Sequence, residues 1–153
     1  MPTATESLPL VDEHSLLIDV APDAVWEALP RVIEGTFGSA TTGRVARLLG
    51  CADVDTSGPR PLDAGSAFPG FHVEAAERGQ ELALAGSHRF SDYALIFHLE
   101  DAGDRGTRLG AETRAAFPGL KGSVYRMLVI GSGVHVLVTR RLLGAIKRRA
   151  ERA

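Results

Sequence analysis

One histidine and one tyrosine lie five residues apart, where one strand is expected to end and the next to begin. His88 continues the alternating set that includes Leu82 and Leu84, so a regular strand would point its imidazole toward the inside of the protein. Imidazole titrates near neutral pH, which makes His88 a candidate general acid or base, with Arg89 or Tyr93 as a candidate to stabilise an oxyanion. A hydrogen-bonded histidine at the end of a core strand explains the same pattern, so both interpretations stay open.

Three further polar side chains fall near or within the most apolar part of the chain. Tyr125 could place a hydroxyl at the rim of a cavity, although core packing explains it equally well. Ser132 and His135 stand beside Gly131 and Gly133, which remove side chains where a helix approaches a sheet or a ligand. These residues therefore predict a pocket wall, and the alternative is a tightly packed helix in which the histidine is bonded to a strand carbonyl.

The sequence shows no cluster that would hold a metal ion or a cofactor. Its five histidines are scattered along the chain. Cys51 is the only cysteine, which excludes an intramolecular disulfide and a zinc site of paired cysteines. The segment Gly131-Ser132-Gly133 lacks the third glycine of a dinucleotide fingerprint. We therefore expect neither a metal nor a cofactor.

Composition is ordinary for a globular protein. Apolar residues make up 44% of the 153 residues and the net charge is −2, which gives nucleic-acid binding no electrostatic support. The most apolar stretch, 124–138, is shorter than the roughly 20 residues that a membrane span needs. The first residues do not resemble a signal peptide. We expect one cytoplasmic domain over 1–153 with a loose lead-in over 1–10 and no stable insertion into a membrane. Whether the protein forms a homodimer stays open.

The periodicity of apolar residues predicts a mixed set of elements. A strand is expected over 13–20, a short helix over 21–29 that Pro30 breaks, a second helix over 40–50 and a long loop over 51–70. Turn residues then separate four strands, and a helical pattern runs from about Gly122 to the end. The four strands are Phe71–Glu77, Glu81–His88, Ser91–Glu100 and Gly106–Phe117.

Alternation in the last two strands gives the expected sheet one apolar and one polar face. The first half of the final helix is apolar all round, which favours burial against that apolar face. A cavity between this helix and the sheet is the resulting hypothesis. Its expected ligand-binding residues are Leu82, Leu84, His88, Tyr93, Leu95, Phe97, Leu109, Tyr125, Leu128, Ser132 and His135.

The order of the elements resembles that of a known superfamily. The opening Ile18-Asp19-Val20-Ala21-Pro22-Asp23-Ala24-Val25-Trp26 and the blocks over 86–100 and 117–143 are similar to those of small START-like (SRPBCC) proteins. That superfamily includes lipid-transfer domains, plant proteins of the birch-pollen-allergen type and polyketide cyclases. The resemblance implies an α+β helix-grip fold, in which an antiparallel sheet curves around a long C-terminal helix and encloses a cavity. It implies no catalytic residue, because the cyclases share no portable motif.

Two functions follow, and the sequence leaves both open. The first is binding of a small, largely apolar molecule, lipid-like or polyketide-like, in the cavity. The second is an enzyme of the cyclase or dehydratase kind that uses His88 to move a proton. A third reading has side chains filling the cavity and the surface carrying the activity. Because the sequence places no acid and base pair together, binding is the preferred prediction.

Overall fold

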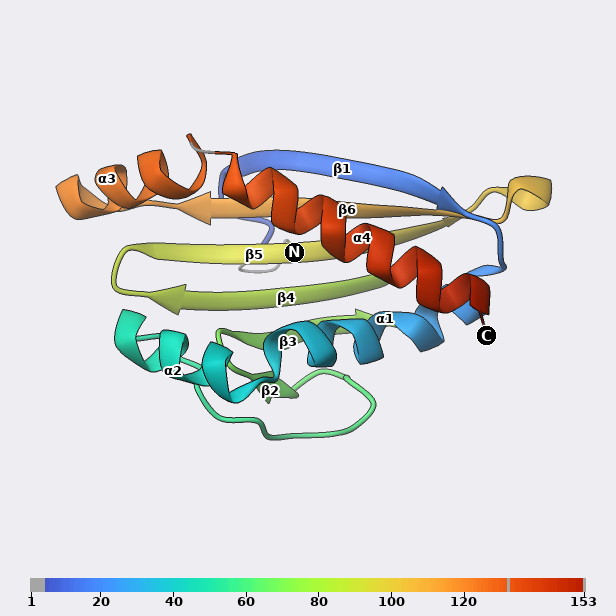
Figure 1. The fold of residues 1–153 in the computed structure, drawn as a ribbon, viewed down its shortest axis with the longest axis horizontal. Coiled ribbons are helices and arrows are strands. Elements are labelled where there is room, and N and C mark those ends of the chain that lie inside the picture. The colour runs from blue at the N-terminus through green and yellow to red at the C-terminus, as the bar shows by residue number, and fades with distance from the viewer. Residues whose placement is uncertain (1–4, 132, 153) are drawn as a thin grey trace.

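A computed structural model describes residues 5–131 and 133–152, so Ser132 lies outside the described residues. Along the chain, one strand is followed by two helices, then by a run of strands, and finally by two more helices (Figure 1). The strands are β1 (Leu10–Ile18), β2 (Ala67–Phe68), β3 (Phe71–Glu77), β4 (Glu81–His88), β5 (Ser91–Asp101) and β6 (Thr107–Ala116). The helices are α1 (Pro22–Phe37), α2 (Ala40–Leu49), the short 3-10 turn η1 (Gly103–Arg105), α3 (Gly119–Val129) and α4 (Val134–Arg152).

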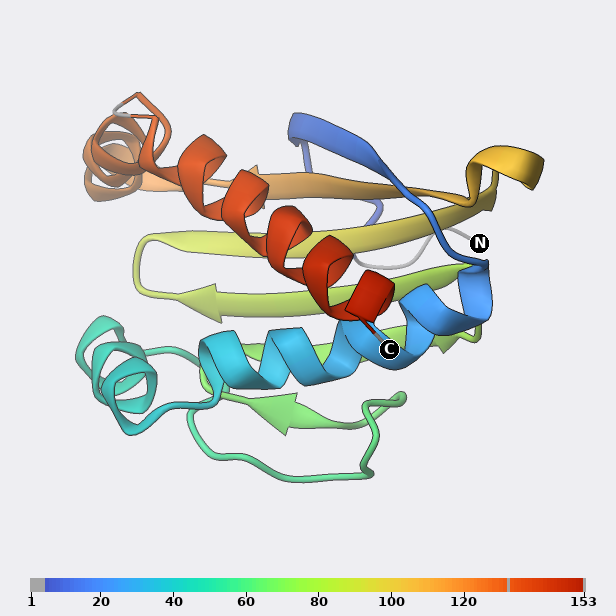
Figure 2. The same ribbon diagram turned by 45° about the vertical axis from the view of Figure 1, so that its right-hand side comes forward.

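The six strands form one antiparallel sheet in the order β1-β6-β5-β4-β3-β2. Helices α1 and α4 pack against each other over one face of this sheet, and α4 crosses it diagonally (Figures 1 and 2). The predicted α+β helix-grip architecture is confirmed. The four strands predicted after residue 70 agree with β3 to β6 to within one residue at each end.

Helix α1 is longer than the sequence suggested. It continues to Phe37 through Pro30, where a short helix was expected to break. Proline inside a helix removes one backbone hydrogen bond and costs about 3 kcal/mol. Leu29 and Ile33 on either side are completely buried, and each such side chain contributes roughly 1.5–3 kcal/mol. Burial of the helix against the sheet therefore outweighs the local cost of the proline.

The predicted long C-terminal helix is confirmed as α4, but it begins at Val134 and not at about residue 122. The segment forms two helices, α3 and α4, whose axes differ by 57°. Gly133, directly before α4, has a positive φ of 78°, which lies outside the helical range and which other residues rarely adopt. A side chain at Gly131 would lie 2.6 Å from the carbonyl oxygen of Met127. These two glycines break the helix and bring it no closer to the sheet.

Burial of the apolar segment was also predicted incorrectly. Helix α3 lies beyond the end of β6 rather than over the sheet (Figure 1). Met127 is 75% exposed and Leu128 is 66% exposed. Among the described residues, no single helix is long and apolar enough to cross a bilayer, although α3 and α4 together reach that length across their bend.

The outer face of the sheet is covered in part by the N-terminal segment. Leu8 packs against Ala83, Ala94 and Ile96 on this face. The guanidinium of Arg114 donates to the carbonyl oxygen of Leu8 at 2.9 Å. The described part of the expected loose lead-in is therefore held against the sheet.

Candidate functional site

A pocket of about 350 Å³ opens on the inner face of the sheet, where neither α1 nor the C-terminal half of α4 covers it. Helices α2 and α3 stand apart at this end of the molecule (Figures 1 and 2). The pocket walls come from the end of α1, from α2, from β3 to β6, and from the facing ends of α3 and α4. Nearly all the groups that line it are apolar, and they include Phe37, Val45, Phe71 and Val138.

Cross-strand rows explain where the pocket begins and the core ends. Gly86, Tyr93 and Ala115 lie side by side across β4, β5 and β6 near one end of the sheet. In that row one tyrosine stands beside a glycine and an alanine, so small side chains leave space. Two rows further along, Leu82 and Phe97 are completely buried beneath the helices. The same face of the sheet is thus pocket at one end and core at the other.

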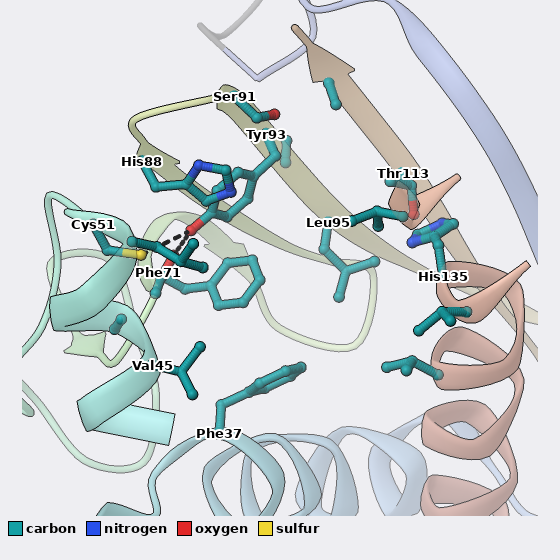
Figure 3. Close-up of a pocket in the computed structure, with 18 of the residues that line it drawn as sticks. Phe37, Val45, Cys51, Phe71, His88, Ser91, Tyr93, Leu95, Thr113 and His135 are labelled. Carbon is teal, nitrogen blue, oxygen red and sulfur yellow. Dashed lines mark hydrogen bonds between the residues drawn. The ribbon is translucent and has the colours of Figure 1, made fainter. Parts of the chain in front are cut away.

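Gly86 fixes the position of Tyr93. A Cβ atom at Gly86 would lie 2.2 Å from the carbonyl oxygen of Gly70 and 2.6 Å from the tyrosine ring. The ring therefore lies across the bare glycine backbone, and its hydroxyl donates to that Gly70 oxygen at 2.5 Å. The Sγ atom of Cys51 lies 3.9 Å from the same hydroxyl (Figure 3). Burial, helped by the neighbouring thiol, raises the pKa of Tyr93 far above its ordinary value.

His88 lies at the same end of the pocket, among aromatic rings. Its ring centroid is 4.8 Å from that of Tyr125 and 5.4 Å from that of Tyr93. Burial lowers the pKa of His88, and the charge of Asp92 opposes this only in part, so the neutral form is favoured. Its Nδ1 accepts from the backbone N–H of Phe90 at 3.1 Å. The neutral ring must then carry its proton on Nε2, which makes it a hydrogen-bond donor.

A second polar group lies toward the other end of the pocket (Figure 3). The Nε2 atom of His135 lies 3.1 Å from Oδ1 of Asp12, so the histidine donates to a carboxylate and not to the strand carbonyl of the alternative interpretation. The other oxygen of Asp12 lies 3.2 Å from Nε2 of His14. Asp12 is paired across the sheet with Thr113, so the two residues are neighbours on one face.

The structure brings five of the predicted site residues together on the pocket wall. They are His88, Tyr93, Leu95, Tyr125 and His135. Their role in binding stays a prediction, because the structure contains no ligand.

The remaining predicted site residues lie elsewhere. Four are fully buried in the core away from the pocket: Leu82, Leu84, Phe97 and Leu109. Leu128 is exposed on α3, and Arg89 is exposed with its side chain against Gly50. Ser132 is outside the described residues. The strand period identified the correct face but not the position along it, which is why these core leucines were selected.

Several wall residues were not selected from the sequence. Phe71 and Phe37 contribute aromatic surface, and Cys51 lies in a loop that carries no periodic signal. Thr113 is the one that a pattern could have identified, because it is a polar residue between Ala111 and Ala115 in the inward alternation of β6. Among the described residues, no group of three or more histidine, cysteine or carboxylate side chains is arranged to hold a metal ion.

Solved structures of other proteins share this architecture. Protein MLL2253 from Mesorhizobium loti aligns with 93% of this chain and 97% of its own, with a TM-score of 0.56 and 14% identity. Ara h 8.0201, a Bet v 1-like protein, aligns with 93% of this chain and 97% of its own, with a TM-score of 0.51 and 14% identity. The chain has the START-like, or Bet v 1-like, fold.

Other matches agree with the START-like assignment. CalU16 from Micromonospora echinospora aligns with 97% of this chain and 95% of its own, with a TM-score of 0.53 and 17% identity. No protein-family model matches the sequence. A search of curated proteins finds no matching sequence either. At these identities the likeness is one of fold, and the START-like fold alone names no ligand.

Proposed function

We propose that this protein binds a small, largely apolar molecule in the pocket between the sheet and helices α2, α3 and α4. The observation that carries the proposal is the pocket itself, about 350 Å³ in volume and lined mainly by aliphatic and aromatic side chains. Sites for drug-sized ligands span roughly 300–1,000 Å³ and combine an apolar wall with a few polar groups. The START-like fold is compatible with such a role.

Filling the pocket tests the proposal. Ala115 lies on the pocket wall beside Tyr93, so Ala115→Leu and Ala115→Phe place progressively more volume in the pocket. The probe is N-phenyl-1-naphthylamine, an apolar dye whose fluorescence rises when it leaves water. Its affinity should fall with the leucine and be lost with the phenylalanine. Ala64→Phe makes the same change in an exposed loop outside the pocket and should bind the dye as the wild type does.

Two results would contradict the proposal. The first is a wild-type protein that takes up no dye. The second is an Ala115→Phe variant that binds the dye normally, because binding would then be elsewhere. Urea unfolding followed through the buried Trp26 shows whether each variant is folded.

A cyclase-like or dehydratase-like enzyme is the second candidate, and the state of His88 is the observation in its favour. With Nδ1 occupied by the Phe90 N–H, its Nε2–H could donate to a carbonyl oxygen and promote enolisation. No carboxylate is among the described residues that line the pocket, and His135, the other histidine of the wall, lies toward the opposite end, so His88 has no base beside it and binding is preferred.

The enzyme candidate can be tested without knowing the substrate. A protein that stabilises enolates should accelerate exchange of the α-hydrogens of 2-tetralone, an apolar bicyclic ketone, in deuterated buffer as followed by NMR. His88→Gln should remove the acceleration. Exchange no faster than in buffer alone would exclude this candidate for ketones of that kind.

A further inference from the structure

The hydroxyl of Thr113 has no partner although it is buried in the pocket wall. The residue is 8% exposed, and its Oγ1 is the one buried side-chain oxygen or nitrogen without a hydrogen bond among the described residues. Burying a hydroxyl without a hydrogen bond costs free energy, and folded proteins rarely leave one in that state. Such a group therefore needs an explanation, and a missing ligand is one of the few available.

Two other buried threonines have hydrogen-bonded hydroxyls. The hydroxyl of Thr107 donates to the carbonyl oxygen of Val20 at 2.7 Å. The hydroxyl of Thr139, which also lines the pocket, donates to the carbonyl oxygen of His135 at 2.9 Å. The absence of a partner is thus particular to Thr113.

Thr113 does not stand alone in the wall. Asp12 is its cross-strand neighbour, and the carboxylate of Asp12 accepts from His135, whose ring also lines the pocket. This pairing holds the imidazole in one orientation and leaves Nε2 as the protonated nitrogen. Thr113 of β6 and His135 of α4 lie side by side in the wall (Figure 3), and Asp12 of β1 completes a polar corner with them.

Two polar groups at the opposite end of the pocket already have partners, and the Nε2–H of His88 belongs to a half-buried side chain, where water can pair with it. The hydroxyl of Tyr93 is bonded to Gly70, and Nδ1 of His88 is bonded to Phe90. Leu95 lies between the two ends in the close-up view (Figure 3). An oxygen on an otherwise apolar ligand gains most where a buried hydroxyl is still unsatisfied, which is at Thr113.

We propose that Thr113, beside the Asp12–His135 pair, is the recognition point for a single oxygen on an apolar ligand, as in an alcohol, a phenol or a ketone. The inference rests on the proposed function and specifies its ligand class. Apolar molecules with one such oxygen should be preferred to hydrocarbons of the same shape, because a hydrocarbon leaves the buried hydroxyl unpaired.

Two probes of matched shape test the preference. 2-Naphthol carries a hydroxyl where 2-methylnaphthalene carries a methyl group, and both can be measured by displacement of N-phenyl-1-naphthylamine. Thr113→Val keeps the side-chain shape and removes the hydroxyl. It should weaken 2-naphthol binding about five- to tenfold, as expected for one hydrogen bond, and leave 2-methylnaphthalene binding unchanged or stronger. Thr139→Val makes the same substitution on the same pocket and should leave the ratio of the two affinities as in the wild type.

The outcomes separate this inference from the proposed function. If the wild-type protein binds neither the dye nor either naphthalene, the pocket is not a binding site and both proposals fall. If the dye and both probes bind, but Thr113→Val leaves the ratio of affinities unchanged, the pocket stands and the recognition point is refuted. If His88→Gln and not Thr113→Val lowers the affinity for 2-naphthol, the ligand oxygen lies at the other end of the pocket, which also refutes it.

Discussion

Replacing Thr113 with valine should make the ligand-free protein more stable. Most substitutions in a protein core destabilise, but this one removes a hydroxyl that is buried without a partner. An unsatisfied buried hydroxyl costs about 1–3 kcal/mol, and valine has nearly the same shape. Taking the lower end of that range, we expect a gain of about 1 kcal/mol in the free energy of unfolding. For a domain of this size that gain corresponds to a rise of roughly 2–4 °C in Tm.

Two other threonines provide the comparison. Thr107→Val removes the hydroxyl that donates to Val20 in a completely buried position, so it should destabilise by about 1–2 kcal/mol. Thr139→Val removes a hydroxyl bonded to a carbonyl of its own helix, and the effect should be within about 0.5 kcal/mol of zero. The identical chemical change is therefore expected to have three different results at three buried sites.

Urea unfolding followed by the fluorescence of Trp26, the only tryptophan and a buried one, measures all three variants. The slope of the transition should be unchanged, so that a shift in midpoint reports stability. If Thr113→Val destabilises as much as Thr107→Val, the Thr113 hydroxyl is hydrogen-bonded in the ligand-free protein. That result would remove the basis for assigning it to a ligand.

Two further predictions concern the other end of the pocket. Gly86→Ala should destabilise the protein by about 1–3 kcal/mol in urea unfolding, because the new Cβ would collide with Gly70 and Tyr93. Gly43→Ala is the control, because its Cβ would meet nothing nearer than 3.8 Å. It should stabilise α2 by up to about 1 kcal/mol. By NMR, His88 should titrate below about pH 6.5, and lower still with an apolar probe bound, because burial lowers its pKa. The unfolded chain therefore binds a proton at His88 more readily than the folded protein does, so the free energy of unfolding should decrease as the pH falls below about 6.5. His88→Gln should make that decrease smaller.

The strands could be predicted from the sequence because their signals are local. Alternation with a period of two sets the inner face, and turn residues such as Gly79, with a positive φ of 75°, set the ends. The helices were less predictable because tertiary packing decides them. Pro30 stays within α1 because the flanking residues are buried, and the apolar α3 is exposed because no strand lies beneath it.

For the candidate site, the sequence predicted the face of the sheet but not the position along the strands. Periodicity identifies which residues face inward, and Leu84, Leu95 and Thr113 lie in one cross-strand row on one face of the sheet. It gives no information about where along the strands the helices cross. Leu84 belongs to the core alone, whereas Leu95, in the same row, belongs to the core and also lines the pocket, as Thr113 does. The positions of α1 and α4 over the sheet decide which part of the face is covered.

Two features of the pocket wall are unfavourable for stability and favourable for a binding site. Gly86 gives up backbone stability so that the Tyr93 ring can lie across it, and Thr113 keeps a hydroxyl that valine would replace without loss of packing. Local exceptions of this kind tend to occur where function requires them. If ligand binding satisfies Thr113, the valine variant must be more stable alone and weaker toward oxygen-bearing ligands. Neither change by itself would distinguish a binding site from an imperfect core, but their opposite signs in one variant would.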